Sequence, residues 1–166
     1  AANTDCIIDA IDISPEALKV AESFFNYRTT KTNSLAILIK EADKLQITSK
    51  SSEFEINEIN ELNAESRRDK YRIHMINVLL GRGSFTNYRI TEFKDNINLK
   101  TEYGDLEIER IAPQFSTVYI ESKSTDINLY FNESSKFGFD ITHTKSETHF
   151  CPKMEIVKEE ILDEKE

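Results

Sequence analysis

Residues 51–73 read SSEFEINEINELNAESRRDKYRI. Phe54 and Ile56 in this stretch are matched, 17 residues further on, by Tyr71 and Ile73. The same apolar pair then recurs at steps of 17, 18 and 21 residues, and it occurs once upstream at a step of 17. Self-similarity at a fixed period is the sequence signature of a stacked-repeat protein. We therefore expect successive windings of the backbone to lie directly on top of one another.

The repeat contains apolar columns on two expected strands and at the corner between them. On the first strand the columns are Ile37, Phe54, Tyr71, Tyr88, Leu106 and Ile127, and Ile39, Ile56, Ile73, Ile90, Ile108 and Leu129. On the second strand they are Leu45, Leu62, Leu79, Ile97, Val118 and Phe139, and Ile47, Ala64, Gly81, Leu99, Ile120 and Ile141. The corner column is Ala42, Ile59, Ile76, Phe93 and Ile111.

Polar residues alternate with the apolar ones on both strands, which is typical of strands with one buried face. Alternation argues against a βαβ sheet, whose strands are covered on both faces. The sequence therefore predicts an all-β, parallel two-sheet β-solenoid of about six rungs, spaced by ~4.8 Å. The general preference of parallel crossovers predicts a right-handed winding.

Charged residues occupy the outward columns and place opposite signs on neighbouring rungs. The expected neighbours are Glu55 with Arg72, Arg89 with Glu107, Glu65 with Arg82, and Lys100 with Glu121. Each exposed pair contributes only about 0–1 kcal/mol, but together the pairs help to set the register. Arg72 beside Arg89 breaks this pattern, and the sequence offers no account of it.

Three regions are expected along the chain. Residues 1–34 form an N-terminal strand or cap and a loop, with a strand over 5–13 and either a helix or a further strand over 14–25. Residues 35–150 form the solenoid, and residues 151–166 form an acidic C-terminal cap or tail. Two insertions, IAPQFS (111–116) and FNESSKF (131–137), predict a bulge at the C-terminal end of one edge.

The composition restricts the possible partners. A net charge of −9 disfavours nucleic acid and unaided docking to anionic lipid. No apolar run reaches the length of a membrane span, so we expect no direct membrane insertion. The chain begins at Ala1 rather than Met, and we expect a mature or trimmed form whose signal peptide is not included.

Three groups of residues are candidate sites. The aromatic trio Phe54, Tyr71 and Tyr88 could stack sugars, but its phase with the isoleucine column predicts a buried stack. The column Glu53, Lys70, Asn87, Asp105, Asp126 and Glu147 could hold calcium, but it lacks the glycine frame of calcium-binding rolls, which favours turn bonding. The last group is His143 and His149, which lie near Cys151 and could form a zinc site, but their spacing matches no standard zinc pattern and a fourth ligand is not evident; His74 is the remaining histidine.

We therefore expect no metal site, no cofactor and no catalytic residues. A polysaccharide-active enzyme on a β-helix would need clustered acids on adjacent rungs, and the outward columns mix signs instead. No Ser/His/Asp or Cys/His arrangement and no phosphate-binding glycine loop occurs either.

Residues 100–129, KTEYGDLEIERIAPQFSTVYIESKSTDINL, carry a family resemblance. The Tyr-Gly-Asp-Leu-x-Ile motif, followed by Phe-x-x-Val-x-Ile-x-Ser-x-x-x-Asp-Ile-x-Leu, resembles the DUF4097 family of β-strand-repeat, adhesin-type proteins, which is common in Bacteroidetes. The earlier segments RDKYRI (68–73) and FTNYRI (85–90) are more degenerate copies. The resemblance covers roughly residues 35–150 and implies a non-catalytic, envelope-associated solenoid.

Three hypotheses for the function follow, of which the third, the polysaccharide-active β-helix enzyme described above, lacks the required cluster of acids. The first is an adhesin or display protein, secreted or in the cell envelope, that contacts a protein or glycan through a rigid surface. The second is a periplasmic scaffold or regulatory module with one dedicated protein partner.

Overall fold

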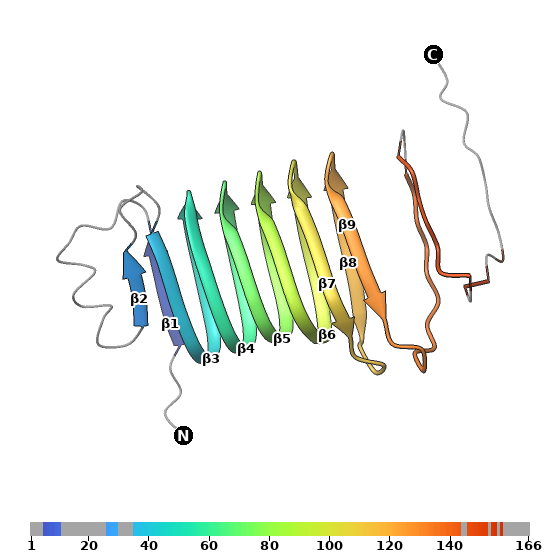
Figure 1. Ribbon diagram of the computed structural model, residues 1–166, viewed down its shortest axis with the longest axis horizontal. Helices are drawn as coiled ribbons and strands as arrows, with labels where there is room; N and C mark the ends of the chain where they lie inside the picture. The colour runs from blue at the N-terminus through green and yellow to red at the C-terminus, as the bar shows by residue number, and fades with distance from the viewer. Residues whose placement is uncertain are drawn as a thin grey trace, which may run out of the picture. The chain divides into compact units, whose positions relative to one another are not determined.

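The structure is a computed structural model that describes residues 5–10, 26–29, 35–143, 146–152, 154, 155 and 157 (Figure 1). It divides into two units, Ala1–Lys136 and Phe137–Glu166. The expected strand or helix over residues 14–25 lies outside the described residues, as do residues 158–166 of the expected C-terminal cap.

The first unit is an all-β solenoid of about six turns with a repeat of about 17 residues, as the sequence predicts. Within the described residues the chain contains strands and no helix. The strands are β1 (Asp5–Ala10), β2 (Asn26–Thr29), β3 (Leu35–Lys50), β4 (Ser52–Arg67), β5 (Lys70–Ser84), β6 (Asn87–Glu102), β7 (Asp105–Ile111), β8 (Thr117–Lys123) and β9 (Asp126–Phe131).

The register of the parallel strands confirms the predicted columns. Ile56 pairs with Ile73 and Ile73 with Ile90, so equivalent residues are immediate neighbours along the stack. The other columns continue in the same way into β7, β8 and β9. The repeat period therefore sets the winding of the chain.

The corner of each winding differs from the expectation. The sequence predicted two short strands in each winding, separated by a tight turn at the corner. β3, β4, β5 and β6 each run unbroken for 15 or 16 residues, and the corner column pairs within the ladder. Only after β6 does a turn of the solenoid divide in two, into β7 and β8. Pro113 lies in the connection, and proline cannot donate to a strand ladder.

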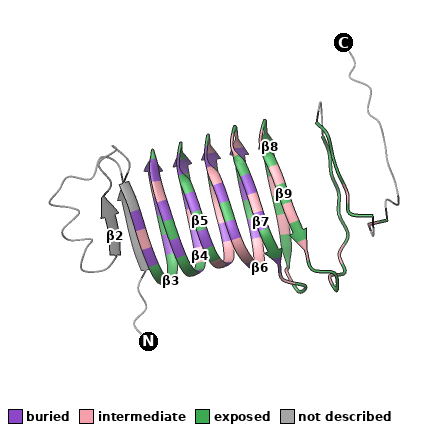
Figure 2. Ribbon diagram, in the orientation of Figure 1, coloured by how far each residue is buried: buried purple, intermediate pink, exposed green. Residues whose placement is uncertain are grey.

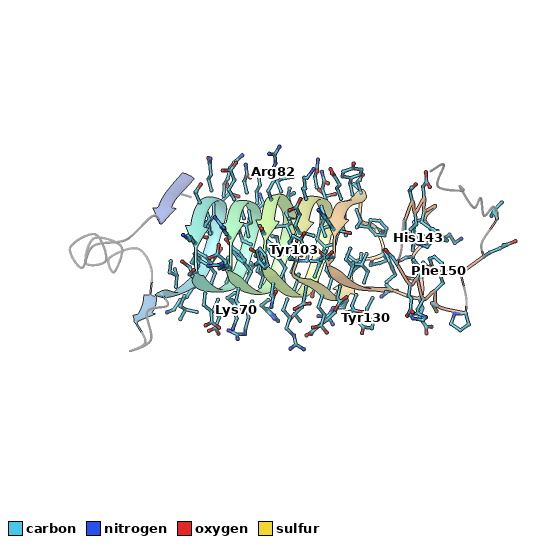
Figure 3. The ribbon with its side chains drawn as sticks, turned by 90° about the horizontal axis from the view of Figure 1, so that it is seen from above. Lys70, Arg82, Tyr103, Tyr130, His143 and Phe150 are labelled. Atoms are coloured by element: carbon cyan, nitrogen blue, oxygen red, sulfur yellow. The ribbon has the colours of Figure 1, made fainter. Side chains whose placement is uncertain are left out.

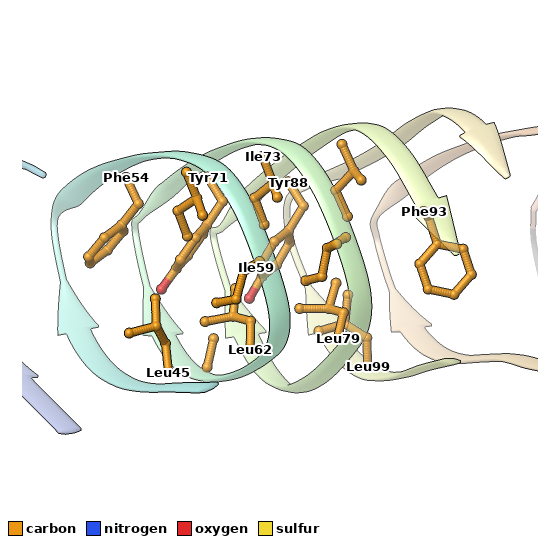
Figure 4. Packing of buried hydrophobic residues seen from close by; sticks show 14 of the residues in the cluster. Leu45, Phe54, Ile59, Leu62, Tyr71, Ile73, Leu79, Tyr88, Phe93 and Leu99 are labelled. Atoms are coloured by element: carbon orange, nitrogen blue, oxygen red, sulfur yellow. The ribbon is translucent and has the colours of Figure 1, made fainter. Parts of the chain in front are cut away.

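The core consists of the apolar columns, which point into the solenoid (Figure 4). Most of these side chains in β3–β6 are fully buried, whereas Ile127, Leu129 and Phe131 of β9 are only partly buried (Figure 2). A side chain inside a stacked-repeat protein is covered by the repeats on both sides of it. Among the described strands, β9 pairs only with β7, so its inward residues are covered on one side.

The columns do not continue to Phe139 and Ile141, which lie outside the strands and are exposed by 40% and 49%. After β9 the chain turns at Asn132, whose Oδ1 accepts hydrogen bonds from the backbone N and the hydroxyl of Ser134. The last strand of the repeat therefore ends at Phe131, the first residue of the inserted segment FNESSKF.

At the other end, β1 and β2 cover the edge of β3. β1 pairs in parallel with the second half of β3, placing Cys6 beside Leu45, and β2 pairs antiparallel with the first half. β1 falls within the strand expected over residues 5–13, of which residues 11–13 lie outside the described residues. Pairing both halves of β3 leaves fewer open backbone groups at that edge.

Candidate functional site: the turn edge

One edge of the solenoid is made by tight turns that join each winding to the next. At each turn one residue other than glycine adopts a positive φ of 48° to 59°: Ser51, Arg68, Phe85, Tyr103 and Ser124. Such residues rarely adopt this conformation, and they keep it only where surrounding contacts enforce it.

A polar residue after each of three positive-φ positions helps to enforce the turn. The hydroxyls of Ser52, Thr86 and Thr125 each donate to the backbone carbonyl two residues earlier, at 3.1–3.4 Å. These hydroxyl contacts are turn-forming bonds of the Ser/Thr type. The sequence predicted turn bonding by the column that begins with Glu53. The residues that form these bonds lie one position earlier, in the column that begins with Ser52.

Asp69 occupies the same position in the second turn and links it to the first. Its buried carboxylate accepts hydrogen bonds from the Ser52 backbone N at 2.7 Å, the Ser49 hydroxyl at 2.7 Å and the Arg67 backbone N at 3.0 Å. A carboxylate that accepts several such bonds is well satisfied without a metal ion. Among the residues that the structure describes, no cluster of His, Cys, Asp or Glu could hold a metal.

Backbone hydrogen bonds connect successive turns into a ladder. The N–H groups of Ser51, Arg68, Phe85 and Tyr103 each donate to a carbonyl of the next turn, at 2.7–2.9 Å. We call the side chains at the tips, Ser51, Arg68, Phe85, Tyr103 and Ser124, the turn edge. Because both the turns and the ladder are hydrogen-bonded, these side chains project from a rigid backbone.

The turn edge carries two exposed aromatic rings that the sequence analysis missed. Phe85 and Tyr103 are exposed by 50% and 41%, and their rings stack with centroids 5.0 Å apart and planes 17° apart. The Lys123 ammonium lies 5.8 Å from the Tyr103 ring centroid. Figure 3 shows this edge from above, with Tyr103 between the solenoid face that carries Lys70 and the face that carries Arg82. The signal for both rings is their equivalent position in the repeat, directly before the column that begins with Ser52.

The predicted aromatic trio forms the buried stack expected of it (Figure 4). Ring centroids lie 4.7 Å apart for Phe54 and Tyr71, and 4.9 Å apart for Tyr71 and Tyr88. The trio therefore belongs to the core and offers no surface for a ligand.

The two tyrosine hydroxyls of this stack differ. Tyr71 Oη lies 2.7 Å from the Ser66 hydroxyl, whereas Tyr88 Oη is buried without a hydrogen-bond partner among the described residues. Gly83 pairs with Ser66 in the ladder, so the next turn lacks the hydroxyl. Burial, as the largest cause, raises the pKa of both tyrosines well above the ordinary value.

Four exposed cations lie at or next to the two turns that precede Phe85. Lys50 pairs with Arg67 in the ladder, and Arg68 is at the tip of the turn before Phe85. Lys70 begins the strand that follows this turn. None of these four cations forms an ion pair within the described part of the chain.

Cations on the outer faces of the strands are mostly neutralised by glutamates on adjacent turns. Arg89 Nε lies 3.0 Å from Glu109 and 3.5 Å from Glu107, and Lys100 lies 2.5 Å from Glu121. The hydrogen bond to Glu109, followed by the charge of Glu107, raises the pKa of Arg89. The expected pairs Arg89–Glu107 and Lys100–Glu121 are confirmed.

The other two expected pairs are register neighbours without an ion pair in the structure. Arg72 contacts Glu53 instead of Glu55, and Arg82 has no ion pair among the described residues. The adjacency of Arg72 and Arg89 now has an explanation. Arg72 reaches toward the preceding winding and Arg89 toward the following one, so each guanidinium has its own carboxylate.

The opposite, bent edge of the solenoid satisfies its polar groups internally. Asn60 donates to Asp43 at 3.0 Å, and Asn77 donates to Asn60 at 2.9 Å, forming an amide ladder. A shallow depression runs along these residues and is also lined by Glu41, Glu58, Met75 and Lys94. Lys94 already contacts Met75 and Glu92. The turn edge therefore has more unpaired groups to offer a ligand.

The histidines expected not to form a zinc site are exposed: His74 on β5, and His143 and His149 in the second unit. His149 lies 4.0 Å from Glu147, and Cys151 is a free, exposed thiol.

Comparisons with protein-family models, with curated proteins and with solved structures found no match to this chain. Over the described residues, no helix is long and apolar enough to span a membrane.

Proposed function

We propose that this chain is a non-enzymatic binding protein that presents the turn edge of a rigid β-solenoid to a glycan or protein. Its mechanism is display: the scaffold holds the contacting side chains in place before the partner arrives. Preorganised side chains lose little conformational freedom on binding, which favours affinity.

The stack of Phe85 and Tyr103 carries this proposal. Aromatic rings are enriched at interfaces because they bring a large contact area at a low entropic cost. Both rings are exposed although each extends from a strained backbone position that hydrogen bonds enforce. A turn without a contact function would be served better by glycine at this position.

The resemblance to the DUF4097 family supports an adhesin-type role, with the protein in the cell envelope or secreted. Neither nucleic acid nor direct insertion into a membrane is part of the proposal, in keeping with the net charge of −9.

A glycan array probed with the fluorescently labelled full chain, together with capture of partners from envelope extract, tests the proposal. We expect binding that is lost in the variant Tyr103→Asn, since asparagine tolerates a positive φ. Tyr130→Asn is the matched control, because Tyr130 is an exposed aromatic residue away from the turns. Binding that survives Tyr103→Asn, or no binding in either assay, would contradict a role for this edge.

A second candidate is a periplasmic scaffold that contacts one dedicated protein. Tyr119 on β8 and Tyr130 on β9 favour it, because both are more than half exposed on the outer faces of the C-terminal windings. Under this alternative, Tyr119→Asn and Tyr130→Asn abolish capture of the partner protein, whereas Tyr103→Asn does not. No glycan on the array binds the chain.

A further inference from the structure

We infer that the turn edge, together with Lys50 and Arg67 directly beside it, binds a polysaccharide that carries carboxylate groups, with the acid held at Lys50, Arg67 and Arg68 and a sugar ring against Phe85. This inference rests on the proposed function and names its ligand class.

Charge supports the acidic part of the ligand. The net charge is −9, yet Lys50, Arg67 and Arg68 lie on adjacent windings and have no ion pair among the described residues. The carboxylate of Asp69, next to Arg68 in the same turn, is buried and accepts three hydrogen bonds from within the turns. Arginine side chains match the planar geometry of a carboxylate and bind it with two parallel hydrogen bonds.

The aromatic stack supports a sugar beside the acid. Tyr103 covers one face of Phe85, and among the described residues neither a ring nor a cation lies against the other face. Phe85 follows Arg68 in the stacked order of the turns, so this free face is on the side of the cations. The C–H groups of a pyranose ring pack well on an aromatic face, and a carboxylate on that sugar would then lie close to Arg68.

Periodicity supports a polymer rather than a single sugar. Neighbouring windings are ~4.8 Å apart, which is close to the length of one sugar residue in an extended chain. An extended glycan along the edge would therefore meet successive turns with successive residues.

The distribution of charge argues against a more highly charged polymer. Beyond the cations the edge is flanked by acids, with Glu102 and Asp105 on either side of the Tyr103 turn. A nucleic acid carries a charge on every residue and would be repelled there. A polysaccharide with interspersed carboxylates can place its uncharged sugars at these turns.

Binding of the purified full chain to polygalacturonate, measured by biolayer interferometry at low and physiological salt, tests the inference. We expect Lys50→Gln/Arg67→Gln to weaken binding at least tenfold, and Phe85→Asn at least fivefold. The control Lys40→Gln/Arg82→Gln removes two exposed cations elsewhere, so it changes the net charge equally and should leave the affinity within twofold. Tyr119→Asn is the matched aromatic control. Thermal unfolding of each variant identifies any loss that comes from misfolding.

The competing ligands are dextran, oligothymidylate and polyglutamate. Binding of polygalacturonate in preference to all three supports the inference. Equal binding of oligothymidylate or polyglutamate would show that charge alone is recognised and would overturn it, as would equal losses in the two double variants. If the chain ignores polygalacturonate but binds a neutral glycan or a protein in a Tyr103-dependent way, the inference fails and the proposed function stands.

Discussion

The windings β3–β6 and the windings β7–β9 follow the same repeat but differ in how well they are closed. In β3–β6 each winding is one unbroken strand, and its inward side chains are almost all fully buried. After β6 the winding is divided: the inward residues of β7, which pairs with both β6 and β9, are still fully buried, but those of β8 and β9, such as Ile127 and Leu129, are only partly buried. The same pattern of apolar residues thus yields a tighter core where described windings cover it on both sides. Four experiments, from the largest expected effect to the smallest, would sharpen or break this comparison.

The largest difference is expected for a charge placed inside the isoleucine column. Ile73→Asp buries a carboxylate between two covered rungs, and we expect it to lower the free energy of unfolding by about 4 kcal/mol or more. Leu129→Asp, in the same column of β9, should cost about half as much, because that position is partly open to water. Urea unfolding followed by circular dichroism measures both. Equal losses would mean that the two regions are equally closed.

The second contrast is between Gly81 inside β5 and Gly138, which follows the last described strand. Gly81 in β5 has a φ of 135°, and a Cβ there would lie 2.0 Å from the Ala64 carbonyl oxygen, so Gly81→Ala must move backbone. The strained backbone alone costs about 1–3 kcal/mol. At Gly138 a Cβ meets nothing within 4 Å, and Gly138→Ala should change stability by less than about 0.5 kcal/mol. Thermal unfolding compares the stability of the two variants. An unchanged melting temperature in Gly81→Ala would contradict the close approach of β4 and β5.

Alkaline pH should destabilise β3–β6 through the buried tyrosines. Burial raises the pKa of Tyr71 and Tyr88 above the ordinary value of 10.0, so below pH ~10 their neutral forms contribute full stability. Above that pH the unfolded chain loses the protons first, and stability falls by about 1.4 kcal/mol per pH unit for each tyrosine. Urea unfolding from pH ~9 to ~11.5 measures the slope. Tyr71→Phe/Tyr88→Phe should flatten it, and an unchanged slope would exclude these residues as its source.

The smallest contrast lies within the buried aromatic stack. Tyr71→Phe removes a hydroxyl that is bonded to Ser66 and should lower stability by about 1 kcal/mol. Tyr88→Phe removes a buried hydroxyl without a partner and should raise stability by about 1 kcal/mol. Chemical unfolding curves for the two single variants give the sign of each change. A loss of stability in both would imply that Tyr88 Oη is bonded in solution, for example to water.

The sequence predicted the buried stack but not the surface that we propose to function. Phe54, Tyr71 and Tyr88 share the phase of the isoleucine column, and that phase alone places them inside. Phe85 and Tyr103 belong to no alternating pattern, because they stand at turns where the period of two is interrupted. Their exposure follows from a positive φ, which depends on hydrogen bonds to the adjacent turns.

The sequence by itself determined the stacking of the windings, because a period of about 17 residues lets every apolar side chain meet its equivalent on the next turn. It also determined which residues are inside, because strand alternation assigns each side chain to one face. Only the tertiary structure decided that the corners of β3–β6 remain within the ladder, that Arg72 and Arg89 turn toward different acids, and which hydroxyl in the core lacks a partner. These depend on contacts between windings distant in sequence, and a pattern along one strand contains no information about the geometry of such contacts.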